Sequence, residues 1–278
     1  MTEMTRGIDE FRQESIKKLR AISSEPLREY MELFSAATGM SKTHALTNAF
    51  EFNSKRKENL HLLEEYISRR CMGIPLPYIT GLKGFWKTEF LVTTDTLIPR
   101  PETELLVELI LSEHKRKNLK ILDLGTGTGA IGISIAEEKP NWKIIATDIS
   151  LLALKTAKIN SRGLKNINFV QSFWLNSIKA SFDIIVSNPP YIRRNDPHLK
   201  DLSYEPRIAL EGGEDGLSPA REIIRTAKSN LVEKGHLYLE HGYDQKNAVI
   251  QILQEHDFCA IHSYKDLSGH DRVIRANS

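Results

Sequence analysis

The chain has 278 residues, of which 40% are hydrophobic and 27% charged, so it is neither a short peptide nor a wholly disordered chain. Its 38 basic and 36 acidic side chains leave a formal net charge of +2, which is too small for a protein whose main task is to coat nucleic acid. The two cysteines, Cys71 and Cys259, lie far apart without metal-ligand spacing, so we expect reduced thiols and no metal.

Charged residues interrupt the first apolar stretch of the chain, at Asp9, Glu10, Arg12 and Glu14. This pattern argues against a secretory signal peptide, and the acidic residues argue against a transit peptide. No segment approaches the roughly 18 uninterrupted apolar residues that a membrane span requires. We therefore expect a cytoplasmic protein with no membrane partner.

Residues 8–71 show the periodicity of helices. The clearest apolar face consists of Leu60, Leu63, Ile67 and Cys71, with charged residues on the opposite face. The sequence therefore predicts a small helical bundle, which we assign to a first domain over residues 1–74.

A linker is expected after this helical region. Gly73, Pro75 and Pro77 should interrupt helix formation, because proline lacks the amide donor and restricts the residue before it. The β-prone stretch over residues 85–94 then predicts a hairpin. We assign residues 75–100 to a linker and β-hairpin, and residues 101–278 to a second, larger domain that opens with a helix over 101–112.

Short apolar runs alternate with helical stretches from residue 119 onward. Strands are predicted over residues 121–124, 142–147, 167–170, 182–187 and 237–240, and helices are predicted to begin near residues 129, 150, 218 and 243. Residues 258–264 and 272–275 are expected to form an extended pair. This βαβ alternation predicts an α/β fold in which helices cover both faces of a parallel sheet, with ligands at the carboxyl ends of its strands.

A glycine-rich turn follows the predicted strand 121–124 and opens a helix; its residues are Gly125, Thr126, Gly127, Thr128 and Gly129. Glycine is needed where the chain turns sharply and brings its backbone against a ligand. Asp148 closes the next strand, where a carboxylate can accept both hydroxyl hydrogens of a ribose. Together these features predict a nucleoside cofactor, but the turn also fits the motif of dinucleotide-binding proteins.

The tetrad Asn188, Pro189, Pro190 and Tyr191 follows the predicted strand 182–187. Because proline has no N–H, this stretch leaves a backbone carbonyl free, and the Asn188 side-chain oxygen is a second acceptor. Two acceptors can hold one planar NH2 group with its weakly nucleophilic nitrogen facing an electrophile. Tyr191 offers a flat face to a planar group.

The glycine-rich turn, Asp148 and the tetrad together resemble the S-adenosylmethionine-dependent methyltransferases that act on planar NH2 groups. These enzymes include DNA adenine methylases, RNA guanine methylases and protein glutamine methyltransferases. The tetrad alone does not choose among them.

The rest of the chain looks like the signature of the peptide chain release factor N5-glutamine methyltransferases; the matching segments are 77–81, 98–104, 196–199, 205–206, 209–217 and 266–272. This resemblance implies a class I, Rossmann-like methyltransferase domain with a mostly parallel seven-stranded sheet, preceded by a helical bundle and a hairpin linker. The implied reaction methylates N5 of the glutamine in a release factor's Gly-Gly-Gln loop. The alternatives are an N6-adenine or N2-guanine nucleic-acid methyltransferase, and a binding protein without turnover.

The resemblance also implies roles for particular residues. The turn Gly125, Thr126, Gly127, Thr128 and Gly129 would bind S-adenosylmethionine, the product being S-adenosylhomocysteine, together with Asp148, Trp174 and Asn188. Asn188, Pro189, Pro190 and Tyr191 would hold the glutamine side chain. The helical bundle would help to dock the release factor, with no direct nucleic-acid partner, no metal and a monomeric enzyme. Phe173 stands where the family commonly has an acidic residue, which leaves the contact to the adenine amino group open.

Overall fold

The computed structural model describes residues 3–46 and 54–278. Residues 47–53, which belong to the expected helical region, lie outside the described residues. The chain divides into two compact units, Met1–Leu82 and Lys83–Ser278. None of the helices within the described ranges is long and apolar enough to cross a membrane.

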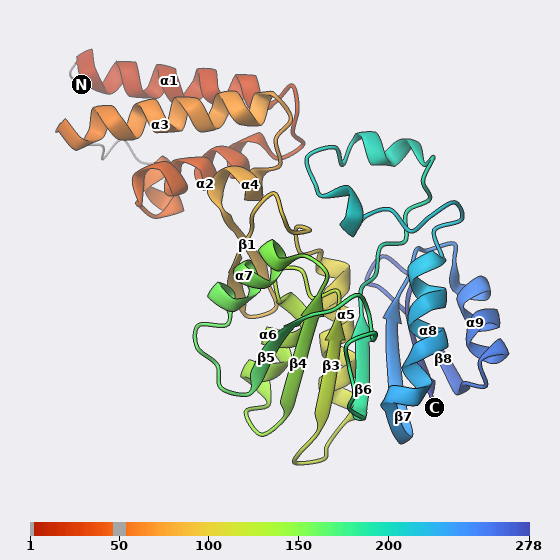
Figure 1. Ribbon diagram of the computed structural model, residues 1–278. Coiled ribbons are helices and arrows are strands. Elements are labelled where there is room, and N and C mark those ends of the chain that lie inside the picture. Colours follow the sequence, from red (N-terminus) through yellow and green to blue (C-terminus); the bar gives the residue numbers. More distant parts are fainter. Residues whose placement is uncertain (1–2, 47–53) are drawn as a thin grey trace. The chain divides into compact units, whose positions relative to one another are not determined.

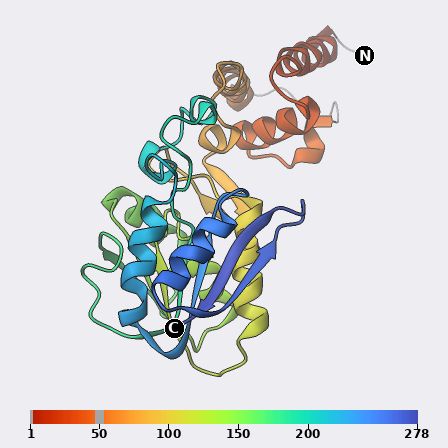
Figure 2. The same cartoon turned by 90° about the vertical axis from the view of Figure 1, so that its right-hand side faces the viewer.

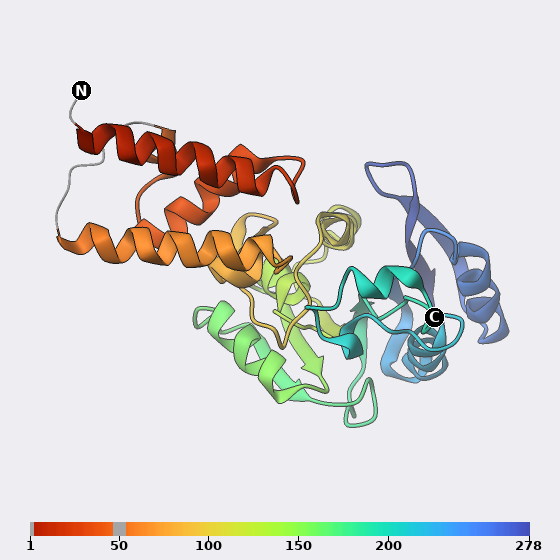
Figure 3. The ribbon, with the colours of Figure 1, turned by 90° about the horizontal axis from the view of Figure 1, so that it is seen from above.

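The described part of the first unit is helical, with α1 (Glu3–Leu19), α2 (Pro26–Thr38), η1 (Lys42–Leu46), α3 (Ser54–Cys71) and α4 (Leu76–Thr80). Helices α1 and α3 lie side by side, and α2 packs against both (Figures 1 and 3). Leu19, Leu33, Leu63 and Ile67 form the centre of its apolar core. The expected apolar face of residues 60–71 is therefore confirmed at Leu63 and Ile67, whereas Leu60 is only half-buried and Cys71, at the end of α3, is exposed.

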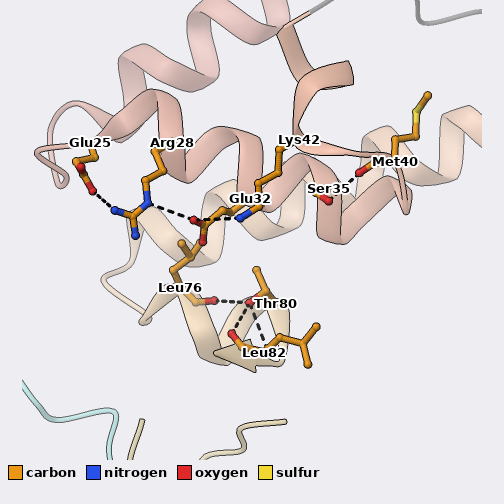
Figure 4. A network of polar contacts seen from close by, with 9 residues as sticks. All are labelled: Glu25, Arg28, Glu32, Ser35, Met40, Lys42, Leu76, Thr80 and Leu82. Atoms are coloured by element: carbon orange, nitrogen blue, oxygen red, sulfur yellow. Dashed lines mark hydrogen bonds and ion pairs between the residues drawn. The ribbon is translucent and has the colours of Figure 1, made fainter. Parts of the chain in front are cut away.

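Helix α4 occupies residues that were expected to be a linker. Pro75 caps the helix and Pro77 lies in its first turn, where a missing N–H costs nothing because it would have no intrahelical partner. The Thr80 hydroxyl donates to the Leu76 carbonyl at 3.2 Å, as Figure 4 shows, and Gly81 ends the helix with φ 77°. The expectation that these prolines prevent a helix was therefore wrong for residues 76–80.

Ion pairs supplement the core of the helical unit. Figure 4 shows Glu32 between Arg28, at 3.3 Å, and Lys42, at 3.5 Å. Such exposed pairs contribute little stability. Arg70 on α3 instead contacts both carboxylate oxygens of Glu29 on α2, at 2.8 and 3.1 Å. This bidentate and largely buried pair fixes how the two helices pack.

The second unit opens with a hairpin of β1 (Leu82–Phe85) and β2 (Thr88–Leu91), whose first residue, Leu82, is the last of the first unit. Its large sheet contains β3 (Lys120–Leu124), β4 (Lys143–Asp148), β5 (Ile167–Gln171), β6 (Phe182–Ser187), β7 (Leu231–Glu240), β8 (Cys259–Lys265) and β9 (Asp271–Asn277). The helices are η2 (Pro101–Thr103), α5 (Glu104–Glu113), α6 (Ala130–Glu138), α7 (Leu151–Asn160), η3 (Pro197–Lys200), η4 (Arg207–Ala209), α8 (Ser218–Asn230) and α9 (Lys246–Glu255).

The seven strands lie in the order β5-β4-β3-β6-β7-β9-β8. The first five are parallel, and β9 pairs antiparallel with both β7 and β8. Helices α5 and α6 pack on one face of the sheet and α8 and α9 on the other, each pair with its own apolar core (Figures 1 and 2). The expected α/β fold with a mostly parallel seven-stranded sheet is confirmed.

Several element boundaries differ from the sequence expectation. The hairpin covers residues 82–91 rather than 85–94, and the helix predicted over 101–112 is divided into η2 and α5. Strand β7 begins at Leu231, six residues before the predicted start, because Lys234 takes up a left-handed conformation (φ 60°) at an irregular point that the alternation pattern does not reveal. Helix α9 begins at Lys246 rather than near residue 243. There the Gln245 side chain accepts the Gly242 N–H at 2.8 Å, which holds residues 242–245 in a turn.

Strand register brings four residues to the same edge of the sheet. Leu124 at the end of β3 pairs with Thr147 on β4 and with Ser187 on β6, and Ser187 pairs with Leu239 on β7. The residues that follow this row are Asp148, Gly125, Asn188 and Glu240. From β3 the chain adds β4 and β5 on one side, and β6 then pairs with the other side of β3. The carboxyl ends of β3 and β6 therefore form the topological switch point, where open α/β sheets bind ligands.

Candidate active site

The glycine-rich turn leaves β3 in conformations that favour glycine. Gly125, Gly127 and Gly129 have φ values of 69°, 56° and 86°. The Thr126 N–H donates to the Thr147 carbonyl at 2.8 Å, which anchors the turn to the neighbouring strand. The backbone of the turn thus approaches open space without side chains in the way, since a Cβ on Gly127 would meet nothing within 4 Å.

A cavity of about 130 Å³ lies beside this turn. Gly125, Gly127, Asp148, Trp174 and Asn188 line it, so the structure brings together five of the residues expected at the cofactor site.

The other residues of the turn lie beneath the cavity. Thr126 and Thr128 are buried, and the Thr126 hydroxyl donates to Asp123 Oδ2 at 2.6 Å. Gly129 caps helix α6. These three residues shape the turn and do not line the cavity.

Asp148 faces the cavity with a carboxylate that the backbone already holds. Its Oδ2 accepts the Gly127 N–H and its Oδ1 accepts the Ser150 N–H, both at 2.9 Å. Burial raises the pKa of this carboxyl, against the lowering effect of those hydrogen bonds. Because each carboxylate oxygen can accept two hydrogen bonds, capacity remains for a pair of hydroxyl groups.

Asp123 is a buried carboxyl that sequence reasoning did not single out. Its Oδ2 accepts hydrogen bonds from the Thr126 hydroxyl and, at 3.0 Å, from the Gly132 N–H. Within the described ranges, Oδ1 is buried without a hydrogen-bond partner. Burial raises the pKa of Asp123 to about 6. Its place two residues before the first glycine was the available signal.

Aromatic side chains form one wall of the same cavity. A ring carbon of Trp174, Cζ3, lies 3.4 Å from the position of a Cβ on Gly125, so a larger residue there would press on the indole. Phe173 also lines the cavity and is half exposed. Phe173, where the family resemblance led us to expect an acidic residue, thus places an apolar ring at the cavity.

The tetrad separates this glycine-turn cavity from a larger one of about 420 Å³. All four members of the tetrad line the larger, tetrad cavity, together with Arg100, Arg272 and Gln245 among others. Asn188 and Pro190 line both cavities, as do Leu97 and Ala209. The two cavities therefore adjoin one another along this part of the tetrad.

Hydrogen bonds fix the tetrad from below. Asn188 Nδ2 donates to Thr103 Oγ1 at 3.0 Å, which leaves Oδ1 as the free end of the amide. The Tyr191 carbonyl accepts from Gln245 Nε2 at 3.0 Å. Asn188 is thus oriented as a hydrogen-bond acceptor, as its expected role requires.

Glu240, at the end of β7, lies under the tetrad and was also missed from the sequence. Its Oε1 accepts the Tyr191 hydroxyl at 3.3 Å, and the side chain is 1% exposed. Burial raises the pKa of Glu240 to about 7, while the Thr103 hydroxyl and the charge of Arg272 act in the opposite direction. Burial and the neighbouring Glu240 also raise the pKa of Tyr191, so its hydroxyl stays protonated.

Among residues 3–46 and 54–278, no three His, Cys, Asp or Glu side chains are arranged to hold a metal ion.

Comparisons with known proteins bear on the fold and the family of the chain. The family model of the methyltransferase small domain matches residues 101–202, and that of the PrmC N-terminal domain matches residues 10–81. The fold is similar to that of a methyltransferase from Pyrococcus furiosus, with a TM-score of 0.54 and 20% identity over 76% of this chain and 98% of that one.

Curated relatives are similar over most of the chain. The release factor glutamine methyltransferase of Coxiella burnetii is 46% identical over 230 residues, which cover 81% of this chain and 82% of that protein. The enzyme of the same name from Escherichia coli strain K12 is 38% identical over 265 residues, covering 94% and 95% respectively. This chain therefore belongs to the release factor glutamine methyltransferase family.

Proposed function

We propose that this protein transfers a methyl group from S-adenosylmethionine to the side-chain amide N5 of the glutamine in the Gly-Gly-Gln loop of a peptide chain release factor. One structural observation supports this proposal in addition to the family to which the chain belongs. Asn188 and Pro190 line both the glycine-turn cavity and the tetrad cavity, so methyl donor and amide acceptor would meet at the tetrad.

The glycine-turn cavity fits the cofactor. Gly127 leaves room for a close approach to the backbone, Asp148 keeps acceptor capacity for two ribose hydroxyls, and Trp174 gives a flat apolar wall to an adenine ring. When bound, S-adenosylmethionine supplies a methyl group activated by its positively charged sulfur. S-adenosylhomocysteine is the product, and the chemistry calls for no metal.

The tetrad prepares the acceptor. An amide nitrogen is a weak nucleophile because its lone pair is delocalised, so catalysis has to come from positioning. Asn188 Oδ1 accepts one N–H of the glutamine amide, and a backbone carbonyl of the proline-rich stretch accepts the other. Tyr191 packs against the plane of the amide. The nitrogen then faces the glycine-turn cavity, and its excess proton leaves to solvent once the methyl group is attached.

The partner of the reaction is a protein loop rather than a nucleic acid. The net charge of +2 gives no general attraction for a polyanion, and the curated relatives are named for release factors. We infer that the helical first domain helps to dock the release factor. We also infer that the enzyme acts as a monomer in the cytoplasm.

Labelled methyl transfer tests the proposal directly. With purified release factor and radiolabelled S-adenosylmethionine, label should enter the glutamine of the Gly-Gly-Gln loop, and replacement of that glutamine should abolish labelling. Label that persists after the replacement would contradict the proposal. Labelling of bare DNA or RNA that nuclease abolishes would instead favour the alternative nucleic-acid methyltransferase.

The Asn188→Ala variant tests the role given to the tetrad. The variant loses one preorganised acceptor, so the transfer rate should fall by about 10²–10³. Single-turnover rates at saturating cofactor measure this loss. Unchanged transfer by the variant would remove Asn188 from the mechanism.

A further inference from the structure

Thr103 and Glu240 lie beneath the tetrad and contact two of its members from two different elements. Thr103 ends η2 and is 4% exposed, and Glu240 ends β7 and is 1% exposed. Thr103 Oγ1 accepts the Asn188 amide N–H at 3.0 Å, and Glu240 Oε1 accepts the Tyr191 hydroxyl at 3.3 Å. Neither residue lines the two cavities, so neither can touch a substrate held there.

The hydrogen bonds in this group have a direction. The Thr103 oxygen accepts from Asn188 Nδ2, so the Asn188 amide is held through its nitrogen and Oδ1 is left as its free end. Loss of the Thr103 hydroxyl would release that nitrogen.

This direction decides which end of the Asn188 side chain reaches the tetrad cavity. An amide can rotate by half a turn at little steric cost, which exchanges its oxygen and its NH2 group. With the oxygen outward, Asn188 accepts an N–H from a planar NH2 group. With the NH2 outward, two donors would face each other and one hydrogen bond would be lost.

We propose that Thr103 is a positioning residue that holds the Asn188 amide by its nitrogen and so keeps its oxygen available to a substrate NH2 group. The effect of this role on rate rests on the proposed function, whereas the hydrogen bond itself needs no substrate. Glu240 holds the other side chain of the pair, the Tyr191 ring, through its hydroxyl.

Thr103→Val tests the proposal, because valine keeps the shape of threonine but removes the acceptor. We expect kcat for release factor to fall by about tenfold to a hundredfold, less than the direct loss of Asn188. Calorimetric binding of S-adenosylhomocysteine should not change. Thr103→Ser, which keeps the hydroxyl, should restore kcat to within a few fold. Thr156→Val removes a buried hydroxyl that bonds within α7 and is the matched control.

A double-mutant cycle separates positioning from general stability. If Thr103 acts through Asn188, Thr103→Val should lower kcat by less than about twofold in an Asn188→Ala background. A full additional loss in that background would overturn the proposal, as would wild-type kcat in Thr103→Val.

An activity-independent readout keeps this inference distinct from the proposed function. The side-chain NH2 resonances of Asn188 can be assigned by their loss in Asn188→Ala. They should shift and exchange faster with solvent in Thr103→Val but not in Thr103→Ser. Unmoved resonances in Thr103→Val would refute the positioning role, whereas a wild-type enzyme that methylates no release factor would refute only the proposed function.

Discussion

Gly129 carries a constraint that is both conformational and steric. Its φ is 86°, and a Cβ there would lie 2.5 Å from Ile133 Cδ1 and 3.2 Å from the Ala157 Cβ. Ile133 is fully buried, so its side chain would have to move within the core. Gly163 has a similar φ of 78°, but a Cβ there would meet nothing within 4 Å.

The two glycines therefore allow a matched experiment. Gly163→Ala should cost only the strain of a left-handed alanine, about 1–2 kcal/mol, whereas Gly129→Ala should cost that strain plus about 1–3 kcal/mol from overpacking. Urea unfolding of both variants measures the difference. Equal losses in the free energy of unfolding of the two variants would show that overpacking against Ile133 adds nothing to the cost.

Glu240 should make stability depend on pH. Its pKa is about 7 in the folded protein against an ordinary 4.5, so between these values the folded chain holds a proton that the unfolded chain has lost. The free energy of unfolding then falls as pH rises through this window, by up to about 3 kcal/mol from this group. Glu240→Gln cannot ionise and should lose less stability between about pH 5 and pH 8.

Urea unfolding at both pH values measures this difference between Glu240→Gln and the wild type. Glu233→Gln, an exposed change on the same strand, is the control. If Glu240→Gln followed the wild-type dependence on pH, the carboxyl of Glu240 would not be held in its protonated form by burial.

The residues of the site that the sequence predicts are those that stand next to one another or follow a strand. Gly125, Asp148 and Asn188 were found in this way, and the structure places them around one cavity. Thr103 and Glu240 were missed as partners of the tetrad. Their proximity to Asn188 depends on strand order and on how η2 packs, which no local pattern encodes.

Among the elements, the end of α5 is tied to the three C-terminal strands by one carboxylate. Glu113 accepts from the hydroxyls of Tyr238 on β7 and Tyr264 on β8, both at 2.7 Å, and from Arg275 Nη1 on β9 at 2.9 Å. Tyr238 is fully buried and the other two partners are half-buried, so removal of the carboxylate takes one hydrogen bond from each of them. Tyr238 keeps its contact with His114, and Arg275 keeps its contact with His262.

Glu113→Ala should therefore lower the free energy of unfolding by about 1–3 kcal/mol. Glu108→Ala removes an exposed glutamate from the same helix and should have little effect. Equilibrium unfolding in urea compares the two variants. A loss in Glu108→Ala as large as that in Glu113→Ala would assign the effect to α5 as a helix and not to this network.

Hydrophobic periodicity predicted most of the strands and helices because each buries one regular face. The prediction failed where an unusual backbone conformation, a side-chain hydrogen bond or a proline decides the local structure. The left-handed Lys234 hides the first half of β7, the Gln245 side chain delays α9, and Pro75 and Pro77 begin α4 where they were expected to exclude a helix. Side-chain hydrogen bonds and backbone irregularities of this kind leave no periodic signal.

At the scale of the whole molecule, every residue that lines the two cavities lies within residues 83–278. A fragment of these residues should therefore fold and bind S-adenosylhomocysteine with nearly the affinity of the full chain. Calorimetry measures both affinities. Loss of binding by a folded fragment would show that the first unit contributes to the cofactor site.

The proposed reaction depends on the tetrad as the place where an NH2 group is held against the methyl donor. Its most direct test is mass spectrometry of release factor after incubation with S-adenosylmethionine and either wild-type protein or Asn188→Ala. We predict a single added methyl group on the Gly-Gly-Gln glutamine with the wild type and a rate about 10²–10³ lower with the variant. Equal methylation by both proteins, or a methyl group on any other residue, would contradict the proposed reaction.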